Sequence, residues 1–257
     1  MMDNKRAVQT QFQGVAGNYA TSQVFTQGID LETLGRAAER LRPRLALDVG
    51  TAAGHTAFTV AQHAKMVVGL DLTGPMLVRA KTDAQARGLS NLSWVQADVE
   101  HLPMANETFD LVTCRFCGHH FPRPDLFIAE TARILRTGGE ILIADTVAPP
   151  TDRFDTWINE IEVIRDPSHV REYRASEWKN LLGTVGLTAE IILDWRLRLD
   201  LADWTARMRT PPEKIAQLRQ RMDEADGDLR STFELETPND GPWSFVLHCA
   251  IIRGVKR

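Results

Sequence analysis

The sequence predicts a doubly wound α/β fold, in which a mainly parallel sheet carries helices on both faces. Apolar runs of strand length alternate with helical segments from Leu45 to Asp145, with short connections between them. A loop of small residues follows the first run, and aspartates end several of the others. This alternation favours a parallel sheet because each parallel strand needs a crossover, usually a helix, before the next one.

The elements of this first part follow in a regular order. Leu31–Leu41 has the apolar spacing of a helix, and Pro43 ends it before the first strand. Proline at the start of Pro75–Ala86 is typical of a first helical turn. In chain order the sequence predicts strands from Leu45 to Asp48 and at Met66–Leu70, Leu92–Gln96, Phe109–Cys114 and Glu140–Ala144, with a further helix at Pro124–Leu135 that is closed by Thr137, Gly138 and Gly139.

The two ends of the chain depart from this rhythm. Residues 1–42 are polar with a few apolar anchors, and we expect them to form a helical arm or lid on a domain spanning residues 43–257. Segments 146–175 and 194–240 interrupt the alternation. Because inserted segments usually carry specificity, we expect these two to form walls around a substrate.

The second half also contains two expected strands and one expected helix. Thr188–Leu193 and Ser244–Ile252 have the apolar content of strands, and Asn239–Pro242 is a turn signal before the second of them. Ser176 opens a helical segment, and we expect its side chain to cap the N-terminus.

Composition indicates a globular protein of the cytoplasm. The chain has 257 residues, of which 43% are hydrophobic, enough for a substantial core. No apolar segment approaches the roughly 20 residues that cross a bilayer, so no stable membrane insertion is expected, and the N-terminus lacks the apolar stretch of a signal peptide. A net charge of −4 argues against a nucleic-acid partner and leaves the oligomeric state open. The arginines that cluster in sequence are interpreted as solvated surface: Arg196, Arg198, Arg207 and Arg209.

Three cysteines do not make a disulfide framework, which suits a reducing compartment. Cys114 and Cys117 form a C-x-x-C motif that is followed by His119 and His120, a combination that also occurs in metal and redox sites. No second ligand pair lies at zinc-finger spacing, and Cys114 ends a strand that should be buried. The preferred interpretation is small, buried, apolar residues and no bound metal.

The small-residue loop after the first strand is suited to hold a ligand. It places a strand, a tight turn and a helix N-terminus in sequence, where backbone N–H groups are free to meet a bound molecule. The spacing of Gly50 and Gly54 around Ala52 is G-x-A-x-G, which is not the dinucleotide fingerprint, and G-K-[ST] is absent. The loop therefore fits a pyrophosphate poorly.

Aspartates at the ends of four strands point to a nucleoside. Ligands of open α/β sheets bind beyond the carboxyl ends of the strands, so these residues should gather at one edge. Asp71 is placed to accept two ribose hydroxyls, and Asp98 to accept the amino group of adenine. Any one of the four, Asp48 and Asp145 included, could alone be a turn or cap residue.

Five motifs in order give the chain a resemblance to class I S-adenosylmethionine-dependent methyltransferases. They are LDVGTAAG at 47–54, VVGLDLTGPML at 67–77, QADVEHLP at 96–103, FDLVTCRF at 109–116 and ARILRTGGEILIAD at 132–145. Residues 5–190 resemble the ubiquinone/menaquinone-biosynthesis-like (methyltransferase type 11) branch. The resemblance implies a Rossmann-like sheet of about seven strands with the last strand antiparallel. Ala52 stands where this family usually has a glycine.

The resemblance also implies which residues bind S-adenosylmethionine. Gly50, Thr51 and Gly54 would wrap the methionine portion, and Asp71 would bind the ribose. Leu72 and Met76 would flank the adenine, although core packing explains Met76 equally well on spacing alone. The remaining expected contacts are Asp98 and Val99 at the adenine edge, Arg115 and Tyr19 at the methionine end, and Asp48, Ala52 and Ala97 within the matching motifs.

Histidines are the expected catalytic residues. His119 and His120 stand where related quinone enzymes carry an Arg-Asn pair, and we expect His119 to be the base or to orient the acceptor, with His120 and His169 as the next candidates. A neighbouring sulfonium should hold such a histidine neutral, the form that accepts a proton. Alternatively, the first two merely cap the helix that begins near Pro124.

The expected function is methyl transfer to an oxygen or carbon of a small lipophilic or aromatic acceptor, quinone-like or a specialised metabolite. An apolar pocket for it could be lined by Phe12, Phe116, Phe121, Trp157 and Trp178. One alternative is a nucleic-acid or protein methyltransferase, against which stand the acidic balance and the sequence CRFC in place of an N-P-P-Y-type tetrad. Another is a protein that binds S-adenosylmethionine without catalysis.

Overall fold

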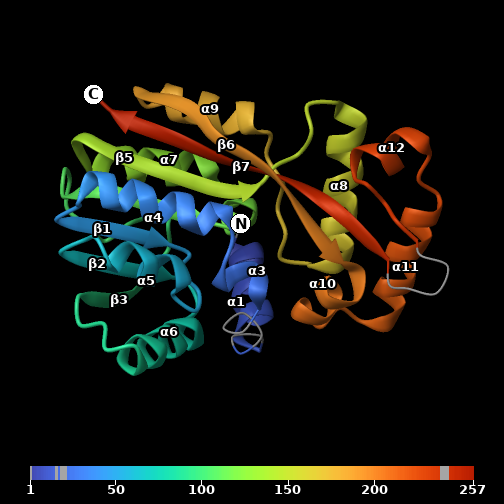
Figure 1. Ribbon diagram of the computed structural model, residues 1–257, viewed down its shortest axis with the longest axis horizontal. Helices are drawn as coiled ribbons and strands as arrows, with labels where there is room; N and C mark the ends of the chain where they lie inside the picture. Colours follow the sequence, from blue (N-terminus) through green and yellow to red (C-terminus); the bar gives the residue numbers. More distant parts are fainter. Residues whose placement is uncertain (1, 15–16, 18–21, 238–242) are drawn as a thin grey trace.

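The structure, a computed structural model, describes residues 2–14, 17, 22–237 and 243–257. Its centre is a seven-stranded sheet with the order β3-β2-β1-β4-β5-β7-β6 (Figure 1). The first five strands are parallel, and β7 is antiparallel to both of its neighbours, which confirms the expected sheet. The strands are β1 (Leu45–Val49), β2 (Met66–Asp71), β3 (Leu92–Gln96), β4 (Phe109–Arg115), β5 (Leu135–Thr146), β6 (Leu187–Asp200) and β7 (Ser244–Lys256).

Helices cover both faces of this sheet. On one face, small side chains of α4 and α5 let the two helices pack closely on β1 and β4. On the other, Phe127 of α7 and Trp178 of α9 are buried against the sheet. The helices are α1 (Met2–Gln13), α3 (Gln23–Thr26), α4 (Ile29–Leu41), α5 (His55–Ala61), α6 (Gly74–Ala86), η1 (Gly118–His120, 3-10), α7 (Pro124–Ile134), α8 (Asp152–Arg165), α9 (Ala175–Thr184), α10 (Leu201–Met208), α11 (Pro212–Asp223) and α12 (Gly227–Thr232).

Several boundaries differ from the sequence-based predictions. Helix α7 ends at Ile134, and β5 begins at Leu135, because the expected Thr137–Gly139 turn is part of the extended strand. Ser176 is not a cap: it lies inside α9, whose N-cap is Arg174, where the backbone N–H donates to Glu177 Oε2 at 2.7 Å. Strand β6 continues past the predicted Leu193 to Asp200.

Beside the sheet, the C-terminal helices build a second apolar cluster, which we call the cap cluster (Figure 1). It joins α8, α10, α11 and α12 to the far ends of β6 and β7. Its largest buried side chains are Trp157, Trp204, Phe233 and Phe245. Trp157 and Trp178, which the sequence suggested for an acceptor pocket, are thus packed in cores. The predicted turn at 239–242 lies outside the described residues.

Across the ranges that the structure describes, the helices are all too short or too polar to cross a bilayer.

Candidate functional site

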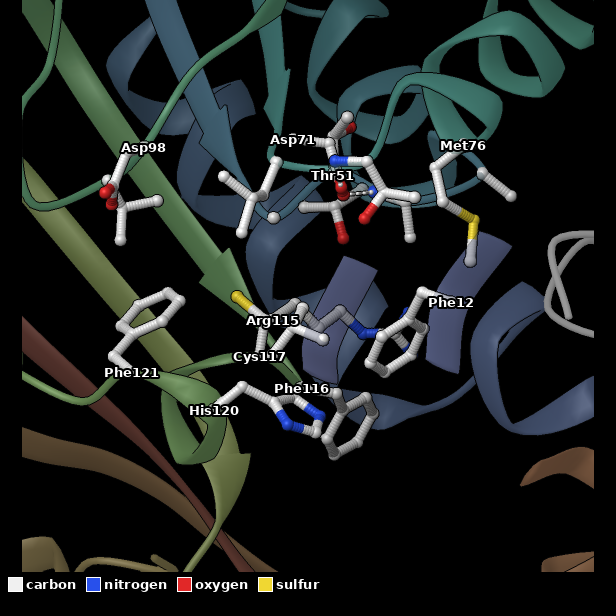
Figure 2. Close-up of a pocket in the computed structure, with 18 of the residues that line it drawn as sticks. Phe12, Thr51, Asp71, Met76, Asp98, Arg115, Phe116, Cys117, His120 and Phe121 are labelled. Atoms are coloured by element: carbon white, nitrogen blue, oxygen red, sulfur yellow. Dashed lines mark hydrogen bonds between the residues drawn. The ribbon is translucent and has the colours of Figure 1, made fainter. Parts of the chain in front are cut away.

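A cavity lies beyond the carboxyl ends of β1, β2 and β4, where a doubly wound sheet binds its ligands. Its empty space, counting the part that is open to solvent, is about 980 Å³. Helix α1 and Phe25 of α3 also line it. Figure 2 shows Thr51 and Asp71 on one side of this space and Phe12, Phe116 and His120 on the other. One wall is therefore polar and the other mainly aromatic.

The loop after β1 forms part of the polar wall. Gly50, Ala52 and Gly54 have φ of 62°, 45° and 90°, so three residues of this turn are in the left-handed region. Gly54 is the N-cap of α5. No side chain caps this helix, so no side-chain acceptor is hydrogen-bonded to the N–H groups of its first turn. A Cβ at Gly50 would lie 2.5 Å from Cys117 Sγ, so only glycine fits there. Gly50, Thr51 and Ala52 line the cavity, as their predicted role requires.

Replacing Ala52 with glycine is expected to stabilise the protein. The left-handed conformation costs an L-residue about 1–2 kcal/mol, whereas glycine adds about 0.5–1 kcal/mol of backbone entropy to the unfolded chain. Ala52→Gly should therefore raise the free energy of unfolding by about 0.5–1 kcal/mol in urea titrations. Ala53, whose φ is not positive, is the matched control, and Ala53→Gly should lower it. Equal losses in both variants would contradict the strain at position 52.

Asp48 supports the loop from beneath and does not line the cavity. Its carboxylate accepts hydrogen bonds from Thr51 Oγ1 at 2.7 Å and Thr113 Oγ1 at 2.8 Å, and it is 1% exposed. Burial raises the pKa of Asp48 to about 6. Two other predicted contacts, Gly54 and Ala97, are also not among the lining residues, whereas Leu72, Met76 and Val99 are.

Asp71, at the end of β2, joins the loop to the polar wall. It accepts backbone N–H groups from Ala52 at 2.9 Å and from Thr73 at 2.8 Å. Asp71 also lines the cavity. Burial raises the pKa of Asp71.

Helix α1 covers the side of the cavity where the sequence placed adenine. Lys5 Nζ contacts Asp98 Oδ2 at 2.5 Å and also pairs with Glu100. Gln9 Nε2 donates to the carbonyl of Leu72 at 3.1 Å. These α1 contacts were missed in the sequence, although Lys5, Val8 and Phe12 stand at i, i+3 and i+7 and so share one helix face. Tyr19, expected to close over the site, lies outside the described residues.

Arg115 lines the cavity, but its guanidinium is largely engaged elsewhere. Its Nε donates to Asp30 Oδ2 at 2.5 Å, and its two terminal nitrogens donate to the carbonyls of Phe25 at 2.9 Å and Val24 at 3.0 Å. Arg115 and Asp30 are both buried. The side chain thus fixes α3 and the start of α4 to the end of β4.

The three predicted histidines come together at the base of the aromatic wall. The ring centroid of His119 lies 4.3 Å from that of His120 and 5.6 Å from that of His169. His120 lines the cavity and its ring packs edge-on against Phe12, whereas the other two are not among the lining residues. The structure therefore groups the three predicted histidines, but His120 and not His119 is the one that lines the cavity.

His120 is neutral with a defined tautomer. Its Nδ1 lies 3.1 Å from the carbonyl oxygen of Ser168. Because a carbonyl can only accept, Nδ1 carries the hydrogen and Nε2 keeps its lone pair. Burial and the charge of His119 lower the pKa of His120 to about 4. At neutral pH this side chain is therefore uncharged, with a free lone pair of low basicity.

The surroundings of His119 instead favour its charged form. Its Nδ1 lies 2.7 Å from Asp145 Oδ1, and its backbone N–H donates to the other carboxylate oxygen at 3.2 Å. Burial opposes the charged form, but the charge of Asp145 and the hydrogen bond to it prevail and raise the pKa of His119 to about 9. The carboxylate of Asp145 therefore favours the charged form of His119, whereas the sulfonium of a bound cofactor was expected to favour the neutral form.

The His119–Asp145 pair predicts a pH dependence of stability. Since the folded-state pKa of His119 is raised from 6.5 to about 9, its contribution is fully present below pH 6.5 and is lost as pH rises through 9. The loss should reach about 3 kcal/mol. His119→Asn should lack this decline when unfolding free energies are measured from pH 6 to 9.5. Variant His101→Asn, at an exposed site, should follow the wild-type curve, and a parallel decline in His119→Asn would contradict the pairing.

No metal centre accompanies these histidines: within the described part of the chain, no three His, Cys, Asp or Glu side chains are grouped to hold an ion. Cys114 and Cys117 are free thiols.

Comparison with known proteins adds to this geometry. Residues 47–143 match the family described as "Methyltransferase domain". The uncharacterized methyltransferase YcgJ of Bacillus subtilis is 34% identical over 97% of this chain and 99% of its own length. The ubiquinone/menaquinone biosynthesis C-methyltransferase UbiE of Allorhizobium ampelinum is 35% identical, but over only 43% of this chain and 46% of its own.

Solved structures agree with the sequence comparison. The crystal structure of Bacillus subtilis YcgJ superposes with a TM-score of 0.85 at 33% identity, covering 89% of this chain and 98% of that one. A putative methyltransferase from Bacillus halodurans gives the same TM-score at 32% identity, over 89% and 99% of the two chains.

Proposed function

Because this chain belongs to the S-adenosylmethionine-dependent methyltransferases, we propose that it methylates an oxygen or carbon of a small lipophilic or aromatic acceptor. The observation that carries the proposal is the aromatic wall of the cavity, which contains a neutral histidine. Phe12, Phe116 and Phe121 provide apolar surface there, and the polar wall lies opposite. An apolar, planar molecule would bury its rings on this wall.

The polar wall has groups that fit the cofactor. Backbone N–H groups of the loop and the N-terminus of α5 suit the methionine end, and Asp71 presents acceptor capacity for ribose hydroxyls. Leu72, Met76 and Val99 offer apolar surface for adenine. When bound, S-adenosylmethionine supplies an electrophilic methyl group, and the residues of this chain need to align the acceptor and exclude water.

In this proposal His120 accepts the acceptor's proton. Its Nε2 bears the lone pair, since Nδ1 donates to Ser168. His119, held as a cation by Asp145, lies directly behind it and opposes protonation of His120. His119 therefore acts as a positioning residue that keeps the base neutral.

The test uses labelled cofactor and a panel of acceptors. Purified protein is incubated with methyl-labelled S-adenosylmethionine and phenols, hydroquinones, fatty acids, RNA or a protein extract, and label is counted in each product. Label is expected in phenolic or quinol products. Transfer to RNA or protein, or binding without any transfer, would contradict the proposal.

His120→Ala is expected to slow transfer by about 10²–10⁴-fold, the usual contribution of a positioned base, with cofactor affinity little changed. His120→Gln serves as the conservative comparison because it keeps a side-chain acceptor but cannot take up a proton. Rates at saturating acceptor and titrations with S-adenosylhomocysteine separate the two effects. Normal turnover in His120→Ala would show that this side chain is not the base.

A further inference from the structure

Two thiols lie in contact in the wall of the cavity and have no part in the proposed transfer. Cys114 Sγ and Cys117 Sγ are 3.2 Å apart. Cys114 is fully buried near the end of β4, whereas Cys117 is half-buried and lines the cavity. Figure 2 shows the Cys117 sulfur between the polar and the aromatic walls.

The Cys117 sulfur rests directly on the cofactor loop. It lies 3.3 Å from the carbonyl oxygen of Val49, to which the thiol donates. It also fills the space that a side chain at Gly50 would take, 2.5 Å from the ideal Cβ position. Cys117 is, in addition, the N-cap of η1, which carries His119 and His120. A shift of this residue would therefore affect both the loop after β1 and the histidines of η1.

We propose that Cys114 and Cys117 are a modification site, forming a reversible disulfide that displaces Cys117 from the loop and weakens cofactor binding. A disulfide requires the sulfurs to approach to about 2.05 Å, more than 1 Å closer than they are. Cys114 is fixed by its pairing with Val49 on one side and Ile143 on the other. Cys117 is therefore expected to be the residue that moves, which would change its contacts with Gly50 and Val49.

The oxidant is a small hydroperoxide such as hydrogen peroxide, which can enter the cavity. The Cys117 thiolate attacks one peroxide oxygen and becomes a sulfenic acid, with release of hydroxide. The Cys114 thiol then attacks that sulfur, the S–O bond breaks and water leaves. In total two thiols lose two hydrogens and one hydrogen peroxide becomes two waters, and a dithiol reverses the change.

The surroundings of the pair set the conditions for this reaction. The hydrogen bond with Cys114, followed by burial, raises the pKa of the Cys117 thiol well above its ordinary value. Since the thiolate is the reactive form, oxidation is slow at neutral pH and accelerates as pH rises. A cofactor in the cavity would cover Cys117, so bound S-adenosylhomocysteine should protect the pair, as reciprocal linkage requires.

The experiment measures disulfide formation and cofactor affinity separately. The protein is treated with hydrogen peroxide at pH 8.5, and the intact mass is expected to fall by about 2 Da, two hydrogens. Trypsin cuts after Arg115, so the disulfide should join peptides 88–115 and 116–133. S-Adenosylhomocysteine should bind the oxidised protein about tenfold more weakly by calorimetry, equivalent to one decade in Kd, with affinity restored by dithiothreitol.

Cysteine variants provide the controls. Cys249→Ser keeps the pair and should behave as wild type, whereas Cys117→Ser and Cys114→Ser should lose both the mass change and the effect of oxidant on affinity. Absence of the linked peptides, or sulfinic acid on Cys117 in their place, would overturn the disulfide. A disulfide with unchanged affinity would overturn its coupling to the cofactor. If reduced wild type does not bind S-adenosylhomocysteine, the cofactor placement on which the coupling rests is wrong, while the mass measurement still decides the disulfide.

Discussion

Asp71→Asn is expected to weaken binding of S-adenosylmethionine by about a hundredfold, because about 3 kcal/mol of charge-assisted hydrogen bonding would be lost. The carboxylate accepts hydrogen bonds from the backbone of Ala52 and Thr73 and lines the cavity. Replacing it therefore affects the ligand directly and also loosens the loop that holds it. Isothermal calorimetry with S-adenosylmethionine and S-adenosylhomocysteine measures the change.

The control for this substitution is another aspartate of the same region. Asp83, on α6, forms an i, i+4 ion pair with Arg79 at the surface, an interaction worth only a few tenths of a kcal/mol. Asp83→Asn should bind the cofactor normally. If Asp71→Asn binds the cofactor with full affinity and its thermal transition is unchanged, Asp71 does not bind the ribose.

Arg115→Met is expected to destabilise the protein by about 3–5 kcal/mol, the usual result of leaving a buried charge without its partner. Arg115 and Asp30 are each 4% exposed in their side chains, and the arginine also satisfies two carbonyls of α3. Denaturant titrations of unfolding measure this loss. Most of it should be recovered in the double variant Arg115→Met/Asp30→Leu, which removes both charges together.

A surface ion pair gives the comparison. Arg79→Met removes the partner of Asp83 at a site where the arginine side chain is 39% exposed, and should cost less than about 1 kcal/mol. If Arg115→Met costs no more than Arg79→Met, the buried pair does not fix α3 and α4 as described.

Local patterns were sufficient for most of the sheet. The predicted strand at Leu92–Gln96 has those bounds in the structure, and the predicted helix at Pro75–Ala86 begins only one residue earlier. Their apolar spacing and flanking turn residues act within a few positions. Strand β6 was predicted too short because its outer residues, such as Arg196 and Arg198, are polar and exposed at the sheet edge. Their strand conformation depends on pairing with β7, about 50 residues later.

For the site, too, local motifs were sufficient for some residues, whereas others depend on contacts between segments that are far apart in the sequence. Motif spacing indicated Asp71 and the loop, and both line the cavity. The protonation of His119 was not predictable, because it depends on Asp145, which the fold brings within 2.7 Å from another strand. His169 joined the cluster because the backbone N–H groups of Val170 and Arg171 both donate to the carbonyl of His119. Contacts of this kind have no periodic signature.

Strand β7 has a consequence for motion in this enzyme. Its residues Ala250 and Ile252 belong to the core beneath the sheet, and Phe245 and Leu247 belong to the cap cluster. One continuous strand thus ties the two apolar cores into a single cooperative unit (Figure 1). The cap is therefore expected to unfold with the sheet and not to swing as a hinged body. We therefore expect cofactor and product to exchange by movement of the N-terminal helix α1, which side-chain bonds such as those of Lys5, Gln9 and Gln11 hold in place.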